Sequence, residues 1–154
     1  MESNNDSLTL KNQLCFPIYL CSKEIIRKYT PILEELDLTY TQYIVMMYFW
    51  EKERSNVKDI GKALILDSST LTPLLKKLEQ KGYITRQRST NDERNLSVVI
   101  TEKGKQLKNK ALTVPKKIGK CINLSEEEAK SLYILLYKVL QNVIKEEEKW
   151  VLLK

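Results

Sequence analysis

Apolar residues recur at helical spacing along most of the chain. Between Leu10 and Tyr29 they fall on one face of a helix, at every third or fourth position. Pro31 disfavours helical geometry in the residue before it, so we expect this helix to end or kink there. A capping-box pattern, Thr-Tyr-Thr-Gln at 39–42, precedes the apolar run 43–50, which predicts a buried central helix.

Two short amphipathic helices are predicted next. The first covers 56–66 with Asn56 as its N-cap, and the second starts at Asp67 or Ser68, either of which can cap it. Gly82 follows the second helix, at the place where a helix C-terminus favours a residue with positive φ. The brief connector between the two helices is typical of a helix-turn-helix.

The pattern then changes to strand-like residues at 83–89 and 96–101, which are separated by turn-forming and charged residues. These segments predict one β-hairpin with a charged tip. Helical spacing resumes at Glu102, is interrupted at Pro115, and resumes again after a second capping box, Ser-Glu-Glu-Glu at 125–128.

This order of elements predicts a mainly α protein with a small β-hairpin wing. Residues 39–101 form a winged helix-turn-helix DNA-binding domain in this interpretation. Residues 8–38 and 102–149 form a helical region whose apolar faces are too long for a single chain in water. We therefore expect a homodimer, with this helical region as its dimerisation region.

Composition removes most enzyme classes. The 154 residues include no histidine, which excludes serine–histidine and cysteine–histidine catalysis as well as histidine metal sites. The three cysteines, Cys15, Cys21 and Cys121, form no C-x-x-C pair, so a zinc site is not expected either. We expect neither an enzyme nor a bound metal or cofactor.

Two further absences bear on localisation. No segment approaches the roughly 20 consecutive apolar residues that a membrane-spanning helix needs. The first residues lack the basic start and the apolar run of a secretory signal. We therefore expect a cytoplasmic protein, without a membrane partner, whose cysteines are reduced thiols at rest.

Charge is concentrated in the middle of the chain. The net charge is +6, yet residues 1–50 carry four basic and six acidic side chains, whereas residues 54–88 carry eight basic and three acidic ones. Such a basic block is typical of proteins that bind double-stranded DNA, although a solvated helix face gives the same pattern.

The second helix of a helix-turn-helix enters the major groove with its N-terminal residues at the base edges. Here its first turns carry small hydroxyl side chains that can approach bases or phosphates, followed by two lysines suited to the phosphate backbone. These candidate DNA-binding residues are Ser68, Ser69, Thr70, Thr72, Lys76 and Lys77. The alternative is that the hydroxyls only cap the helix and the lysines are only solvated.

The hairpin adds four further candidates for DNA binding. Arg94 at the tip suits insertion into a narrow minor groove. Asp92 cannot attract DNA itself, and we expect it to hold an arginine in position through a charge-assisted hydrogen bond. Arg86 and Arg88 flank the tip at the base of the hairpin.

Several motifs are similar to those of a known family. Asp92-Glu-Arg94, followed by V-x-I-T-x-x-G at 98–104, resembles the wing signature of MarR-type transcriptional regulators. Residues 66–86 and the sequence NQLCF at 12–16 resemble the recognition helix and the sensing-cysteine segment of that family's organic hydroperoxide resistance repressors. The resemblance runs through most of the chain in consistent order.

The resemblance implies a homodimeric repressor that releases operator DNA when an organic hydroperoxide oxidises Cys15, whose thiolate is held by the hydroxyls of Tyr29 and Tyr40. Helix geometry adds a constraint, because Tyr29 lies about 21 Å along the helix from Cys15 of its own chain. We therefore expect the contact across an antiparallel dimer. Tyr19, one turn from Cys15, shares its face. A thiolate is nucleophilic toward peroxide, and the sulfenic acid that results condenses with another thiol.

Two other cysteines are candidates for that second thiol. Cys21 lies about 9 Å along the same helix from Cys15 and on another face, too far for a disulfide, so we interpret it as a packing residue. Cys121 is similar to the resolving cysteine of the two-cysteine subtype of these repressors, which pairs with the sensing cysteine of the other subunit. The alternative is resolution by a small cellular thiol.

Three other functions stay open. A repressor of the same fold could be released by a small phenolic ligand without cysteine oxidation. Cys15 could instead serve a thiol peroxidase, although the basic winged helix would then have no role. A winged helix that binds proteins rather than DNA is disfavoured by the basic block and by Arg94.

Overall fold

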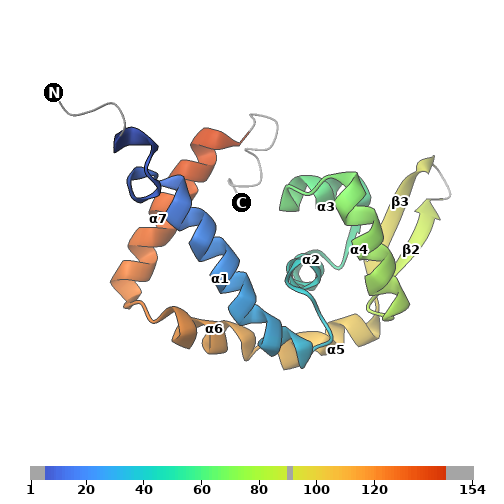
Figure 1. Cartoon of the computed structure of the whole chain (residues 1–154). Coiled ribbons are helices and arrows are strands. Elements are labelled where there is room, and N and C mark those ends of the chain that lie inside the picture. The colour runs from blue at the N-terminus through green and yellow to red at the C-terminus, as the bar shows by residue number, and fades with distance from the viewer. Residues whose placement is uncertain (1–5, 90–91, 145–154) are drawn as a thin grey trace.

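The computed structural model describes residues 6–89 and 92–144, with only the backbone for residues 6, 88, 89 and 92–95. Two 3₁₀ turns, Asp6–Leu8 and Leu10–Asn12, precede the first helix. The helices are α1 (Cys15–Glu34), α2 (Tyr40–Lys52), α3 (Val57–Leu64), α4 (Ser68–Gln80), α5 (Glu102–Ala111), α6 (Val114–Ile122) and α7 (Glu126–Val143), and the strands are β1 (Arg54–Asn56), β2 (Ile84–Ser89) and β3 (Asp92–Ile100) (Figure 1). The predicted class, mainly α with a small β wing, is confirmed.

Local sequence sets most of the helix starts. Both predicted capping boxes are present, since Thr39 and Gln42 exchange hydrogen bonds at the start of α2 and Ser125 and Glu128 do so at the start of α7. Asn56 caps α3 as predicted. These caps satisfy N–H groups that have no partner within the helix, so they mark the start of each helix within one residue.

The first helix differs from the prediction at both ends. It begins at Cys15 rather than near Leu10, with Pro17 in its first turn, where a proline removes no hydrogen bond of the helix. The prediction for Pro31 was an end or a kink, and the first alternative is wrong, because the helix continues through Pro31 to Glu34. Complete burial of Leu33 offsets the hydrogen bond that Pro31 cannot donate.

The wing is a three-stranded sheet rather than the single hairpin predicted. β2 and β3 form the hairpin, with Arg86 opposite Val98. β1 adds a third strand on the other side of β3, antiparallel to it, with Ser55 opposite Val98. The prediction missed β1 because three polar residues carry no strand-like alternation.

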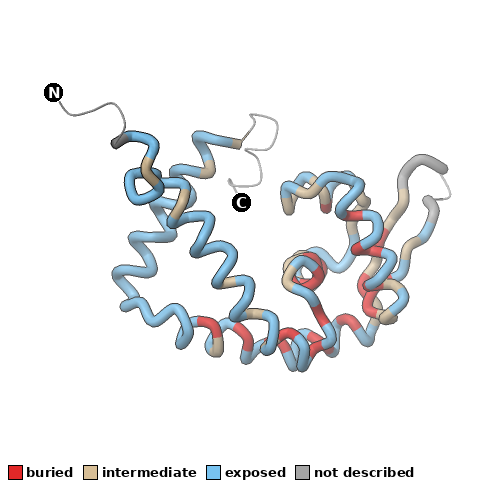
Figure 2. Tube along the Cα trace, viewed as in Figure 1, coloured by how far each residue is buried: buried red, intermediate tan, exposed pale blue. Residues whose placement is uncertain are grey.

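Side chains of α2, α3, α4 and the sheet form one hydrophobic core, to which the end of α1 and parts of α5 and α6 also contribute. The predicted central helix is confirmed, because its apolar run 43–50 supplies several of the buried side chains. The largest fully buried residues are Leu33, Val45, Met46, Phe49, Ile60, Leu71, Leu75, Leu78, Ile84, Val98 and Val114. Figure 2 shows that the first turns of α1 and the whole of α7 lie outside this core.

The junction between the wing and α5 explains the V-x-I-T-x-x-G motif. The Thr101 hydroxyl donates a hydrogen bond to the Gly82 carbonyl over 2.6 Å and accepts one from the Gly104 N–H over 3.0 Å. A Cβ on Gly104 would overlap the Tyr83 carbonyl oxygen. Gly82 has a φ of +76°, as predicted for the residue that ends α4. The motif therefore fixes the direction of α5 relative to the wing.

Candidate nucleic-acid interface and thiol site

Helices α3 and α4 are joined by a tight turn. Ile65 adopts the left-handed conformation, with φ of 52° and ψ of 47°, and so reverses the chain after α3. A Cβ on Gly61 would lie 2.8 Å from the Leu66 carbonyl oxygen, so the close approach of the turn to α3 requires glycine. This packing holds α3 in a fixed position relative to the start of α4, as in a helix-turn-helix.

The Asp67 carboxylate organises the start of α4. It accepts hydrogen bonds from the Ser69 hydroxyl at 2.5 Å, from the Thr70 N–H at 2.8 Å and from the Thr70 hydroxyl at 3.2 Å. The bond from Ser69, and then the bond from the Thr70 N–H, hold the pKa of Asp67 below its usual range. Two of the hydroxyls predicted to contact DNA therefore also act in the helix cap.

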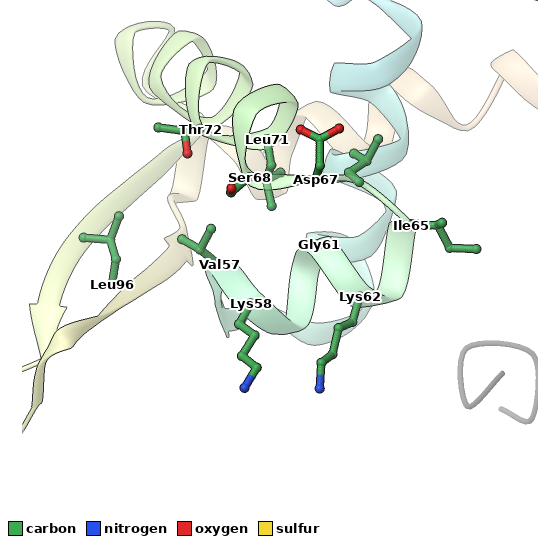
Figure 3. A pocket seen from close by; sticks show the side chains of 11 residues that line it. Val57, Lys58, Gly61, Lys62, Ile65, Asp67, Ser68, Leu71, Thr72 and Leu96 are labelled. Atoms are coloured by element: carbon green, nitrogen blue, oxygen red, sulfur yellow. The ribbon is translucent and has the colours of Figure 1, made fainter. Parts of the chain in front are cut away.

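An open hollow of about 800 Å³ lies between α3, the first turns of α4 and β3 (Figure 3). Ser68 and Thr72 of α4 line it, and Leu96 of β3 borders it on the wing side. Lys58 and Lys62 of α3 also line it and project from the same side of their helix (Figure 3). The prediction omitted these two lysines as DNA-binding candidates, although their four-residue spacing within the basic block was a usable signal.

The base of the wing is tied to α4. Arg86 donates hydrogen bonds to the Glu79 carboxylate from Nε at 2.8 Å and from its backbone N–H at 2.8 Å, and its Nη2 lies 2.7 Å from the same carboxylate. These bonds hold the pKa of Glu79 below its usual range. The Arg86 guanidinium is therefore engaged within the protein, whereas Lys76 and Lys77 are exposed on α4.

Three candidates occupy the tip of the wing. Arg88 lies near the end of β2, and Asp92 and Arg94 lie at the start of β3. Their side chains fall outside the described residues, as does the hydrogen bond predicted between Asp92 and an arginine.

All three cysteines are exposed free thiols in the single chain. Cys15 is the first residue of α1, where the free N–H groups of a helix N-terminus favour negative charge. Cys121 lies one residue before the end of α6. Cys21 is exposed as well in the single chain, because this half of α1 projects beyond the core, so the packing predicted for Cys21 requires a partner subunit.

Tyr29 of α1 and Tyr40 of α2 lie side by side, with ring centroids 4.9 Å apart, and Tyr43 lies 6.0 Å from Tyr29. Burial, followed by the neighbouring Tyr40 and Tyr43, raises the pKa of Tyr29, so its hydroxyl stays a donor at neutral pH. Cys15 lies on the same continuous helix as Tyr29, about 21 Å of helix rise away. Tyr19 is exposed near Cys15.

A further set of contacts joins the end of α4 to the connection between α1 and α2. The Lys81 ammonium lies 2.9 Å from the Asp37 carboxylate and 3.3 Å from the Gln42 side-chain oxygen. Gln42 also accepts the Thr39 N–H in the capping box of α2, whose first residue is Tyr40. The tyrosine pair is thus linked to the recognition helix through the start of α2. Sequence reasoning missed Lys81, because its partners lie about 40 residues away.

Helices α1 and α7 carry large apolar residues that are exposed, and most of both helices has the colour of exposed residues in Figure 2. No residue of α7 is buried. The exposed fraction is 70% for Leu14, just before α1, and 60% for Leu135 of α7. The exposed apolar residues of α7 are Leu132, Tyr133, Ile134, Leu135, Leu136, Tyr137, Val139 and Val143. An apolar surface of this extent is typical of a protein–protein interface.

A membrane-spanning helix and a metal-binding cluster are both absent from the part of the chain that the structure describes. None of its helices combines the length and the hydrophobicity needed to cross a membrane. None of its clusters of cysteine and acidic side chains could hold a metal ion.

Sequence and fold match one family of regulators. Residues 27–111 match the family model of the transcriptional regulators SarA and Rot. The organic hydroperoxide resistance transcriptional regulator of Bacillus subtilis (strain 168) is 44% identical over 143 residues, which cover 93% of this chain and 97% of that protein.

Two solved structures of AbfR, a protein of Staphylococcus epidermidis, have a similar fold. Reduced AbfR bound to DNA matches with a TM-score of 0.74 and 34% identity over 93% of this chain and 100% of that chain. AbfR with a disulfide formed matches with a TM-score of 0.65 and 33% identity over 92% of this chain and 96% of that chain. The chain therefore belongs to the SarA/Rot family of transcriptional regulators, which are winged-helix DNA-binding proteins of the MarR type.

Proposed function

We propose that this chain is a homodimeric repressor whose Cys15 is oxidised by organic hydroperoxides, which releases the protein from operator DNA. The observation that carries the proposal is the contact between Tyr29 and Tyr40, which brings two phenol donors together far from Cys15 of the same chain. The relatives support it, since one is named for organic hydroperoxide resistance and AbfR is known both reduced on DNA and with a disulfide.

The proposed dimer covers the apolar surface of α1 and α7. Residues 8–38 and 102–149 form the dimerisation region in this proposal, and residues 39–101 form the DNA-binding domain. If the two copies of α1 run antiparallel, Cys15 of one subunit approaches Tyr29 and Tyr40 of the partner subunit. The thiol site would then depend on the geometry of the dimer, which also sets the spacing of the two recognition helices.

The proposed chemistry begins with the Cys15 thiolate, stabilised by hydrogen bonds from the two phenols. Its sulfur attacks the peroxide O–O bond, so that an S–O bond forms as the O–O bond breaks. The cysteine becomes a sulfenic acid, and the hydroperoxide is reduced to an alcohol that takes up a proton. The thiolate of Cys121 from the partner subunit then attacks this sulfur, so that an S–S bond forms as the S–O bond breaks, and the hydroxide that leaves takes up a proton from solvent to give water. Tyr19, near Cys15, is the third proposed member of the site.

In the DNA-bound state, the start of α4 lies in the major groove and the tip of the wing lies over the minor groove. Two other residues hold the wing in position in this proposal. Arg86 does so through its ion pair with Glu79, and Asp92 does so at the tip of the wing. The proposed DNA-contacting residues are Ser68, Ser69, Thr70, Thr72, Lys76, Lys77, Arg88 and Arg94.

The test uses a DNA duplex selected by the wild-type protein from a random pool. Cumene hydroperoxide should release the wild-type protein from this duplex and produce a covalent dimer on non-reducing electrophoresis. Cys15→Ser should stay bound and form no covalent dimer, because the nucleophile is absent. Cys121→Ser should form no covalent dimer either, whereas Cys21→Ser serves as the matched control and should behave as the wild type.

Each contrary result has a distinct meaning. Release of Cys15→Ser by the hydroperoxide would refute the sensing role. A covalent dimer that persists in Cys121→Ser would refute the pairing of the two cysteines. Release of Cys15→Ser by a phenol would favour a ligand-controlled repressor, and sustained peroxide turnover with a dithiol would favour a peroxidase.

A further inference from the structure

We propose that Lys58 and Lys62 of α3 form a phosphate-binding site, which holds the DNA strand that borders the major groove while the start of α4 lies in that groove. The inference rests on the proposed operator binding and goes beyond it, because it assigns contacts outside the recognition helix and the wing. The partner is the sugar-phosphate backbone of duplex DNA.

The position of the two lysines supports this assignment. Both are exposed, and their four-residue separation places them about 6 Å apart along the helix axis, on one side of α3. Both line the hollow that Ser68 and Thr72 line from the α4 side (Figure 3). In this proposal, a strand that passes these two hydroxyls continues to the two ammonium groups, which project on the side of α3 away from α4 (Figure 3).

The charges near the lysines are also suitable. The two closest carboxylates along the sequence are engaged elsewhere, because Asp59 accepts a hydrogen bond of 2.8 Å from the Asn56 amide and Asp67 caps α4. Neither Lys58 nor Lys62 forms an ion pair with any residue that the structure describes. Both ammonium groups are thus available to phosphate oxygens.

The packing of α3 makes the site rigid. The close approach of Gly61 to the Leu66 carbonyl fixes α3 against the turn, and Leu71 of α4 lies 3.6 Å from the position of a Cβ on Gly61. In a helix-turn-helix the first helix crosses the DNA backbone. The lysines are therefore held at a fixed offset from the residues that read the groove, as a contact that sets the position of the protein on DNA requires.

The test measures how binding to the selected duplex, and to a scrambled duplex of the same length, depends on salt. A dimer carries four of these lysines, and each neutralised phosphate contributes about 0.9 to the slope of log K against log salt. The double variant Lys58→Gln/Lys62→Gln should therefore reduce the magnitude of this negative slope by about 3 to 4 on both duplexes. It should weaken binding to both by a similar factor, because phosphate contacts carry no sequence information.

Lys116→Gln/Lys120→Gln is the matched control, with the same spacing and exposure on α6, at the other side of the molecule (Figure 1). This control should have the same salt slope as the wild type. The variant Lys58→Arg/Lys62→Arg should also have the wild-type slope, because arginine keeps the positive charge. The single variants, each expected to give half of the loss, keep the test decisive if the double variant loses its helical circular dichroism.

An unchanged slope in the Lys58 and Lys62 variants, with wild-type binding intact, would refute this inference alone. Weaker binding to the selected duplex but not to the scrambled one would also refute it, because the lysines would then read bases. Failure of the wild-type protein to bind any duplex would instead refute the proposed operator binding.

Discussion

Single residues determine the shape of this protein where two backbone segments touch. Gly61 lets the turn approach α3, and Gly104 lets the first turn of α5 lie against the Tyr83 carbonyl. The Asp67 carboxylate gathers the Ser69 and Thr70 donors into one cap. None of these residues contributes a large apolar area, yet each fixes the direction in which the chain continues.

Gly104→Ala should destabilise the protein by about 2 kcal/mol or more, because the added methyl overlaps the Tyr83 carbonyl and lies 2.8 Å from Ile100 Cγ1. Gly119→Ala is the matched control, since a Cβ there meets nothing within 4 Å. It should stabilise α6 by about 0.5–1 kcal/mol, the usual difference between the two residues inside a helix. Urea denaturation measures both, and equal shifts in the two variants would contradict the expectation.

Pairs of elements are joined by ion pairs that differ in exposure. Arg86 and Glu79, which connect β2 to α4, have side chains that are 23% and 33% exposed. Lys117 and Glu35, which connect α6 to the end of α1, are 41% and 64% exposed. The first pair also includes a backbone hydrogen bond, so it positions the wing on the recognition helix more firmly than charge alone would.

A double-mutant cycle with Arg86→Met and Glu79→Gln should give a coupling energy of about 1 kcal/mol that changes little with salt. The same cycle with Lys117→Met and Glu35→Gln should give a coupling energy of only about 0.3 kcal/mol. This coupling energy should vanish in high salt, because both charges are well solvated. Thermal unfolding at two salt concentrations provides the comparison. Equal coupling energies would show that exposure doesn't distinguish these pairs.

The molecule as a whole has a packed part and an open part. The core lies among α2 to α6, the sheet and the end of α1, whereas α7 and the first turns of α1 consist of exposed and half-buried residues (Figure 2), several of them large and apolar. In the proposal, Cys15 belongs to the open part, whereas Tyr29 and Tyr40 pack against the core and the DNA-binding residues lie on elements of the packed part. The contacts of Lys81 with Asp37 and Gln42 join the end of α4 to the connection between α1 and α2 and to the start of α2.

Leu135→Lys should shift the protein toward monomers, because it places a charge within the apolar surface of α7 that the proposed dimer buries. Binding to a duplex with two half-sites should weaken in parallel, since a monomer engages only one. Gln80→Lys, which adds the same charge at an exposed position of α4 outside the proposed dimerisation region, is the control for the sedimentation measurement. Sedimentation velocity measures the shift, and a dimer unaffected by Leu135→Lys would place the interface elsewhere.

Local patterns predicted the starts of α2, α3, α4 and α7, the helix-turn-helix and the hairpin correctly, because a cap joins residues only three positions apart and amphipathic spacing is visible within two turns. The capping boxes at Thr39 and Ser125 and the cap at Asn56 are examples. The basic block and the hydroxyl residues at the start of α4 also stood out from the sequence. All of these depend on neighbours along the chain.

Packing in three dimensions decided the remainder. It added β1 to the sheet, carried α1 through Pro31, paired Arg86 with Glu79, and set Lys58 and Lys62 beside the start of α4. It also brought Tyr29 against Tyr40. Each of these outcomes depends on burial or on contacts between separate elements, and the energy of such contacts is not encoded in any short stretch of sequence.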